Sequence, residues 1–334
     1  MKIKEKNKNI ISSILRFTIA VSIIFFLTYG NKKLILQTIQ SVNPKWFILA
    51  IIFFFLSFTI CIARWYSLLR LQNINISFFE TFSLGMKGMF FSLIIPGAVG
   101  GDLAKAGFIS AKTNKGMKTK AVFSILIDRI LGLLGLFILA AVLGIINFKE
   151  IAKFASSAKI IVFVISIGII IAIIGIGMIF FHRSIEKIRI LKIFLETTDK
   201  YTNGMPSRLM EALDQYRKSY VKLILWIFVS AIFVHTSQGV AVYCLINGTG
   251  NYGQKINYVI LTSSLANALG AIPITPSGLG TRDIAITSLL TLSGLNKEKA
   301  ISVSIMNTGL IILFNLSGGI FLLFKTKKKI LHTN

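Results

Sequence analysis

The sequence has few acidic residues and few charged residues of any kind. Only 12 of its 334 residues are Asp or Glu, and charged side chains make up 15% of the chain. The hydrophobic set AVILMFWYC makes up 54%, and the mean hydropathy is +0.76. Soluble domains are typically about 25% charged, so this composition excludes a soluble globule. Uncharged runs of about 20 residues, enough to cross a bilayer core, indicate a multi-pass membrane protein.

Residues that commonly carry catalysis or hold cofactors are also scarce. The two cysteines, Cys61 and Cys244, lie inside apolar runs and predict neither a disulfide nor a zinc site. The phosphate-binding string G-x-x-x-x-G-K-[ST] does not occur. No His, Cys and Asp residues have the spacing of metal ligands. We therefore expect no metal, no cofactor and no enzymatic activity.

The basic residues, in contrast, are numerous. The chain has 37 Lys and Arg and a formal net charge of +25. In a soluble protein this surplus would indicate nucleic-acid binding. Here the basic residues cluster between apolar runs, as they do in cytoplasmic loops of membrane proteins. We therefore expect membrane lipids, and no nucleic acid, as partners.

The apolar runs predict six membrane-spanning helices. They cover residues 11–29, 46–63, 121–147, 159–181, 223–246 and 299–324. If both termini are cytoplasmic, the segments on that side hold 24 basic residues and the outer segments hold nine. These cytoplasmic segments are 1–16, 64–70, 112–120, 182–222 and 325–334. The bias predicts a cell-membrane protein with both termini in the cytoplasm.

Two further apolar stretches, 78–111 and 256–292, are interrupted by helix-breaking residues. The breakers are Pro96, Gly97, Gly100 and Gly101 in the first stretch and Pro273, Pro276, Gly278 and Gly280 in the second. Pro removes a backbone donor and Gly costs about 1 kcal/mol relative to Ala in a helix. We interpret each stretch as a re-entrant hairpin of two half-helices, the first entering from the cytoplasm and the second from outside. The alternative is one kinked span plus a loop, which would reverse the charge bias of every later loop.

The order of these elements predicts an inverted repeat. Residues 1–147 and 148–334 each read crossing, crossing, hairpin, crossing, but start from opposite sides, and the second repeat carries the basic loop 182–222. The predicted fold is all-α, with about six transmembrane helices and two oppositely oriented re-entrant hairpins. Inverted repeats with broken helices are typical of secondary transporters.

Six ionisable residues lie in or beside the predicted membrane helices and are candidates for substrate binding. They are Asp102, Lys105, Asp128, Arg129, Arg282 and Asp283. An ionised group at the centre of a membrane helix costs about 2.5–3.5 kcal/mol, so it usually faces a partner or a cavity. Two interpretations stay open: a site for a charged headgroup, or structural ion pairs.

Individual roles can be proposed for several of these residues. Asp102 directly follows two glycines and precedes an apolar helix, which is the position of an N-cap residue. Its carboxylate either caps this half-helix or contacts a ligand. Asp128 and Arg129 point about 100° apart on a helix, so each needs a partner from another segment. Together with Lys87, Lys105 and Arg282, Arg129 is one of four cations that we place outside the loops. His235 is expected to be an interior group, with a proton relay as the alternative.

Three motifs, taken together in this order, resemble a known family. They are the string Pro96 to Asp102 with Lys105, the pair Asp128 and Arg129 followed by Gly132, and the stretch Pro273 to Asp283 preceded by Asn267. The chain resembles the lysylphosphatidylglycerol synthetase transmembrane, flippase-like family over about residues 11–324. Members of that family that make aminoacylated lipid carry a separate soluble synthase domain. The resemblance therefore implies that a lipid is moved or bound between leaflets without being synthesised.

The leading hypothesis is a flippase or transporter for an anionic or aminoacylated lipid. In it, Lys105 and Arg282 contact phosphate while Asp102 and Asp283 cap their helices. The alternative is a membrane-embedded glycolipid-modifying or lipid-modifying enzyme, or an accessory subunit of one, with small-solute transport third. A separate lipid-modifying enzyme is a possible partner.

Overall fold

A computed structural model describes the chain over most of its apolar segments. The described residues are 37, 40, 42–95, 99–114, 116–152, 162–163, 166–170, 173–175, 177, 204–272 and 275–323. Every regular element among them is a helix. The all-helical fold class is therefore confirmed.

Four of the helical segments are long and apolar enough to cross a membrane. They are α3 (Pro44–Leu71), α6 (Lys118–Ile146), the segment Tyr220–Gly248, and the segment Lys297–Leu323. The third joins α11 (Tyr220–Val229), the π-helix η1 (Ser230–His235) and α12 (Thr236–Gly248), and the fourth joins α15 (Lys297–Ser317) and α16 (Ile320–Leu323). They match four of the six predicted crossings. Of the other two, 11–29 lies outside the described residues and 159–181 is described only in short helical pieces.

Helix α3 continues beyond its predicted end at residue 63. Arg64, which we assigned to a cytoplasmic loop, lies within the helix and is only 5% exposed. That assignment was wrong, because a paired arginine does not have to end a membrane helix. Arg70 does lie near the end, in the last turn, where a cation complements the helix dipole.

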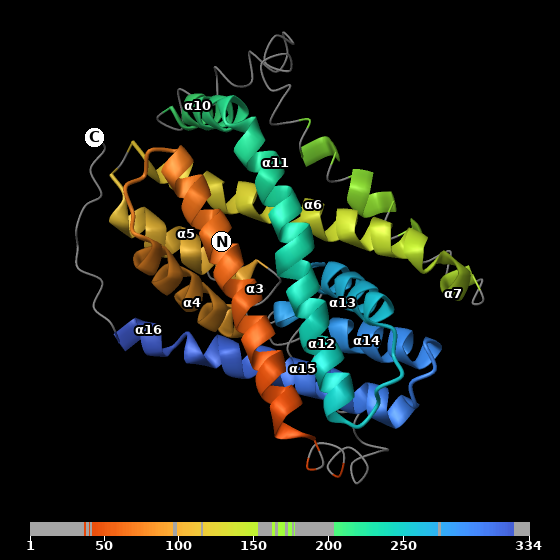
Figure 1. The fold of residues 1–334 in the computed structure, drawn as a ribbon. Helices are drawn as coiled ribbons and strands as arrows, with labels where there is room; N and C mark the ends of the chain where they lie inside the picture. Colours follow the sequence, from red (N-terminus) through yellow and green to blue (C-terminus); the bar gives the residue numbers. More distant parts are fainter. Residues whose placement is uncertain are drawn as a thin grey trace, which may run out of the picture.

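Each interrupted stretch forms two helices that pack against each other. The first stretch contains α4 (Phe78–Ile94) and α5 (Gly100–Lys112), and the second contains α13 (Ile256–Gly270), the short 3-10 helix η2 (Pro276–Gly278) and α14 (Thr281–Leu292). The two pairs lie on opposite sides of the bundle (Figure 1). Of the predicted breakers, Pro96, Gly97 and Pro273 lie outside the described residues.

Close backbone approach explains two of the glycines in these stretches. A Cβ added to Gly101 would lie 2.7 Å from the carbonyl oxygen of Gly88, so α5 can approach α4 only without a side chain there. Gly278 has φ +69°, and an added Cβ would lie 2.7 Å from the Gly270 backbone. At the open end of the first pair, Lys112 forms a 2.8 Å ion pair with Glu80. The two glycines thus let the helices of each pair pack closely beside the turn.

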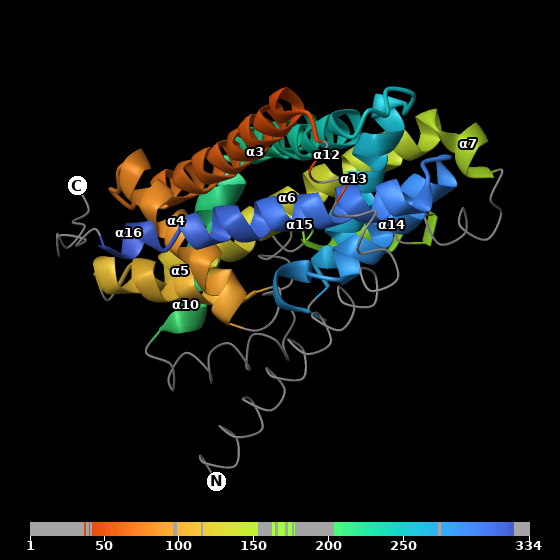
Figure 2. The same ribbon diagram turned by 90° about the horizontal axis from the view of Figure 1, so that it is seen from below.

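The two halves of the chain pack against each other reciprocally. Helix α3 packs along α12, and the two lie together on one side of the bundle (Figure 2). Helix α6 packs against α13, and α15 packs against α4. In the predicted repeat α6 corresponds to α15 and α4 to α13, so each of these contacts is the counterpart of the other.

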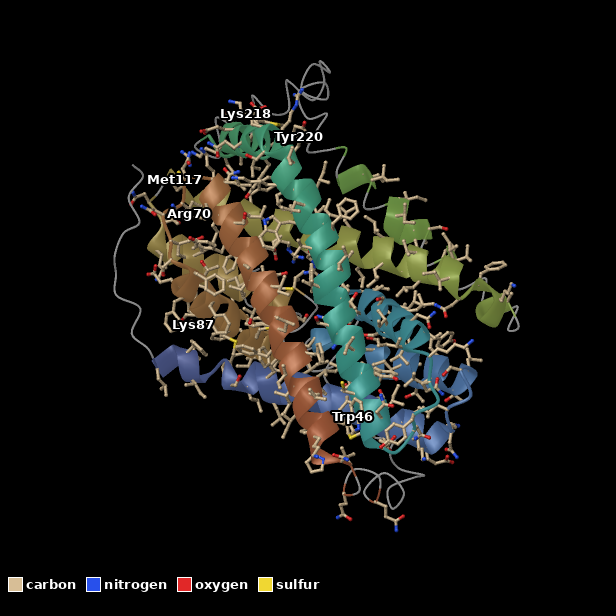
Figure 3. The ribbon with its side chains drawn as sticks, in the orientation of Figure 1. Trp46, Arg70, Lys87, Met117, Lys218 and Tyr220 are labelled. Atoms are coloured by element: carbon tan, nitrogen blue, oxygen red, sulfur yellow. The ribbon has the colours of Figure 1, made fainter. Side chains whose placement is uncertain are left out.

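Three of the basic segments meet at one end of the bundle. Figure 3 labels Arg70, Met117 and Lys218 at that end and Trp46 at the opposite end of α3. Lys218 is the last residue of α10 (Met205–Lys218). Tyr216 of this helix is fully buried, and its hydroxyl donates to the carbonyl oxygen of Leu68 at 3.3 Å. These labelled residues come from three segments that we predicted to be cytoplasmic.

Candidate functional site

A cavity of about 300 Å³ lies where the two helix pairs meet α6, α12 and α15. This volume is at the lower end of the range for small-molecule sites, which suits a headgroup rather than a whole lipid. Its polar lining consists of two arginines and seven amide or hydroxyl residues. They are Arg129, Arg282, Ser92, Gln238, Ser263, Asn267, Ser277, Asn307 and Asn315. No carboxylate belongs to this lining among the residues that the structure describes.

The turns of the two helix pairs are joined at the cavity. The hydroxyl of Ser277, in η2, donates to the carbonyl oxygen of Ser92, near the end of α4, at 3.0 Å. The side-chain amide of Asn315, in α15, donates to the hydroxyl of Ser92 at 3.3 Å. Residues separated by about two hundred positions in sequence therefore form one wall.

Arg129 connects the two interrupted stretches. Its Nη1 donates to Asp102 at 2.9 Å, and its Nη2 lies 3.5 Å from the carbonyl oxygen of Ala271, just after α13. Asp102 also forms an ion pair with Lys105 at 3.2 Å, so one carboxylate is shared by two cations. Lys105 itself lies 5.6 Å from the ring centroid of Trp65.

The expected capping role of Asp102 was wrong. Helix α5 already begins at Gly100, its N-cap is Val99, and no side chain caps it. Asp102 therefore lies inside the first turn, where a negative charge still complements the helix dipole. Its carboxylate points to the two cations instead of the backbone.

Asp128 has its partner on another helix, as its position required. Arg64 Nε lies 2.6 Å from Asp128, with side-chain exposures of 6% and 14%. Nη1 of the same arginine donates to the hydroxyl of Ser230 in η1 at 2.7 Å. Gly132 leaves room for the guanidinium, since an added Cβ would lie 3.0 Å from it. Asp128 thus serves a structural pair that joins α3, α6 and η1.

Arg282 and Asp283, although adjacent, have different surroundings. Asp283 is 1% exposed and accepts hydrogen bonds from the backbone N–H of Gly280 at 2.9 Å and from the hydroxyls of Ser304 and Thr308 at 2.7 Å each. It caps α14, as expected, and does not line the cavity. Arg282 does line it, and donates to the carbonyl oxygen of Ser277 at 3.3 Å. In the described part of the chain, its buried Nε has no hydrogen-bond partner and no carboxylate lies within ion-pair distance of it.

Of the six predicted residues, two line the cavity, Arg129 and Arg282. Asp102 and Lys105 adjoin it through Arg129, while Asp128 and Asp283 are held by other partners. Sequence reasoning missed Arg64 and most of the uncharged polar lining. One signal was present: Asn307, Ile311 and Asn315 recur every fourth residue on one face of α15.

His235 takes the interior position that we expected. Its Nε2 lies 2.9 Å from the carbonyl oxygen of Gly132, which links the end of η1 to α6. A single π-helical turn inside an α-helix is often found at a functional site. Within the described ranges, no three His, Cys, Asp or Glu side chains are placed to hold a metal ion.

Comparison with known proteins gives a matching family model and a similar membrane protein. The model of a family described as the lysylphosphatidylglycerol synthase TM region matches residues 13–319, which include every cavity residue. The chain is also 22% identical over 307 residues to the UPF0104 membrane protein PH1989 of Pyrococcus horikoshii. That alignment covers 85% of this chain and 88% of the relative.

Proposed function

Because the chain belongs to the lysylphosphatidylglycerol synthase TM region family, we propose that it binds a lipid with an anionic headgroup in the cavity and moves it between the leaflets. The observation that carries the proposal is Arg282. Its side chain lines the cavity, its buried Nε has no hydrogen-bond partner among the described residues, and no described carboxylate lies within ion-pair distance of it. A phosphate oxygen would supply both the acceptor and the counter-charge.

The charges around the cavity support an anionic ligand. Arg129 and Lys105 both pair with the carboxylate of Asp102. Asp128 forms an ion pair with Arg64, and Asp283 accepts hydrogen bonds from hydroxyl and backbone donors. The described surroundings therefore hold more positive than negative charge. Leaving that excess unbalanced inside a membrane is costly, and a bound phosphate reduces the cost.

The arrangement of the helices supports movement of the ligand as well as binding. We infer that residues 1–147 and 148–334 form an inverted repeat, because α6 packs on α13 as α15 packs on α4. In transporters built this way the substrate lies between the repeats, and rocking of one repeat against the other exposes the site to each side in turn. Here the headgroup would pass between the turns of the two pairs, with the lipid tails remaining in the bilayer.

The same proposal gives the protein an orientation in the cell membrane. We propose that both termini are cytoplasmic and that the two helix pairs enter the membrane from opposite faces. Arg70, Met117 and Lys218, which come from three segments with several basic residues, lie at one end of the bundle (Figure 3). This supports the orientation, because cytoplasmic ends are rich in basic residues.

Lipid movement in reconstituted vesicles tests the proposal. Purified protein is placed in liposomes with a trace of fluorescent phosphatidylglycerol, and quenching of the outer leaflet reports how fast the probe crosses. We expect the wild type to accelerate crossing, Arg282→Ala to lose that acceleration, and Arg282→Lys to keep part of it, since Lys keeps the charge but not the guanidinium geometry.

The matched control is Arg70→Ala, which removes an exposed arginine at the end of α3 and is expected to leave the rate unchanged. Gel filtration and circular dichroism verify that each variant is folded. A wild-type rate from folded Arg282→Ala, or no acceleration by the wild type, would refute the proposal.

A further inference from the structure

The uncharged part of the cavity lining indicates which headgroup it recognises. Besides its two arginines the polar lining is made only of amides and hydroxyls, and Phe54 is its one aromatic residue among those described. We propose that the cavity selects lipids whose phosphate carries a neutral, hydroxyl-bearing group such as glycerol or a sugar, and rejects headgroups that end in an ammonium group. This inference rests on the proposed function and narrows its substrate class.

An ammonium group would find no suitable partner among the described residues of this cavity. Proteins hold such groups with carboxylates or with several aromatic faces. The acids on the neighbouring helices, Asp102, Asp128 and Asp283, are each engaged by cations or by hydroxyl and backbone donors. An aminoacylated headgroup would therefore place its positive charge beside Arg129 and Arg282 without compensation.

A hydroxylated headgroup, in contrast, matches the polar groups that are left without partners. Two buried cavity atoms have no hydrogen-bond partner among the described residues: Arg282 Nε, a donor, and Asn315 Oδ1, an acceptor. A phosphate oxygen satisfies the donor, and a hydroxyl donates to the acceptor without adding charge. Because both residues line one cavity of about 300 Å³, a single small phosphorylated polyol can contact both side chains once they turn these atoms toward it.

The neighbouring amides suit the same group. Asn267 donates to Gln238 at 2.8 Å, so the two amides form a pair that holds both side chains in place. Amides and hydroxyls can both donate and accept, so rows of amides are suited to polyols. A site built to bind a hydroxyl disfavours an analogue that lacks it, because the buried polar group then stays unpaired.

Selectivity among lipids of one acyl composition tests the inference. Fluorescent phosphatidylglycerol, phosphatidic acid, phosphatidylethanolamine and lysylphosphatidylglycerol are compared in the vesicle assay. We expect phosphatidylglycerol to cross about tenfold faster than either ammonium-bearing lipid, the effect of about one unmade hydrogen bond. Free glycerol 1-phosphate is added as a competitor, and inhibition by it would show that the headgroup alone occupies the site.

Replacing Asn315 separates the hydroxyl contact from the phosphate contact. Asn315→Leu should slow phosphatidylglycerol to the rate of phosphatidic acid, which has no glycerol headgroup, and leave phosphatidic acid unchanged. Asn315→Asp, of nearly the same shape, should favour phosphatidylethanolamine at the expense of phosphatidylglycerol, because it supplies the missing carboxylate. It remains a usable test if the leucine variant does not fold.

Several outcomes would overturn the inference. If lysylphosphatidylglycerol or phosphatidylethanolamine crosses as fast as phosphatidylglycerol, the inference fails and the proposed function stands. If folded Asn315→Leu slows phosphatidic acid and phosphatidylglycerol equally, the hydroxyl contact is refuted. If no lipid crosses faster than in protein-free vesicles, both the inference and the proposed function fail.

Discussion

The ion pair between Arg64 and Asp128 is expected to stabilise the fold strongly. Its two side chains are 6% and 14% exposed and lie 2.6 Å apart, and Arg64 also donates to Ser230. Removing one partner of a buried pair leaves the other charge without compensation, at a cost of about 3–5 kcal/mol. We therefore expect Arg64→Met and Asp128→Leu each to lower the thermal stability of the purified protein markedly.

The double variant separates the cost of an unpaired charge from the value of the pair. Replacing both partners with apolar residues removes both buried charges, and such replacements are often neutral or even stabilising. Arg64→Met with Asp128→Leu should therefore be more stable than either single variant. The measurement is thermal unfolding in one detergent, followed by size-exclusion chromatography after heating, for all four proteins.

A second ion pair provides the control. Lys120 and Glu211 also lie in contact, but Glu211 is 58% exposed. Although the Lys120 side chain is only 7% exposed, the carboxylate of Glu211 is largely in water, which weakens the pair. Glu211→Gln keeps an acceptor for Lys120 and should lower the melting temperature less than either single variant of the buried pair. If the single variants at Arg64 and Asp128 are as stable as this control, or if the double variant is no better than the worse single variant, the structural role of the pair is refuted.

Three further predictions concern the backbone, the orientation and the chemistry. Gly278→Ala should destabilise the protein much more than Gly250→Ala. Both glycines have positive φ, but an added Cβ would lie 2.7 Å from Gly270 at position 278 and would meet nothing within 4 Å at position 250. Equal melting temperatures of the two variants would contradict this. Single cysteines in 112–120 should be labelled only from the cytoplasm and those in 293–298 only from outside, and labelling of 112–120 from outside would exclude the inverted repeat. Purified protein incubated with phosphatidylglycerol and charged tRNA should form no aminoacylated lipid, and a product would favour the enzyme hypothesis.

Some features of the molecule could be predicted from residues taken along the chain. The membrane class and four of the long helices follow from hydropathy, which sums over neighbouring residues. The interruptions of both apolar stretches follow from local backbone chemistry, since Pro and Gly break helices wherever they stand. The positions of charged residues along the chain also marked Arg129 and Arg282, which both line the cavity.

Other features depend on which segments meet, and these the sequence did not determine. Arg64 looked like a loop residue, because its role as an interior cation exists only through Asp128, 64 residues away. Asp102 looked like a cap, because its local sequence does not show that Arg129, on the separate helix α6, pairs with its carboxylate.

The cavity itself was decided by the tertiary structure. Ser92 and Ser277 carry no charge and follow no helical pattern in the sequence, and Asn315 was marked only by its recurrence with Asn307 on one face of α15. They become one wall because the turns of two helix pairs meet beside α15. The sequence marked most of the charged groups inside the helix bundle, but not Arg64, and the packing of distant helices decided which of them are paired and which line the cavity.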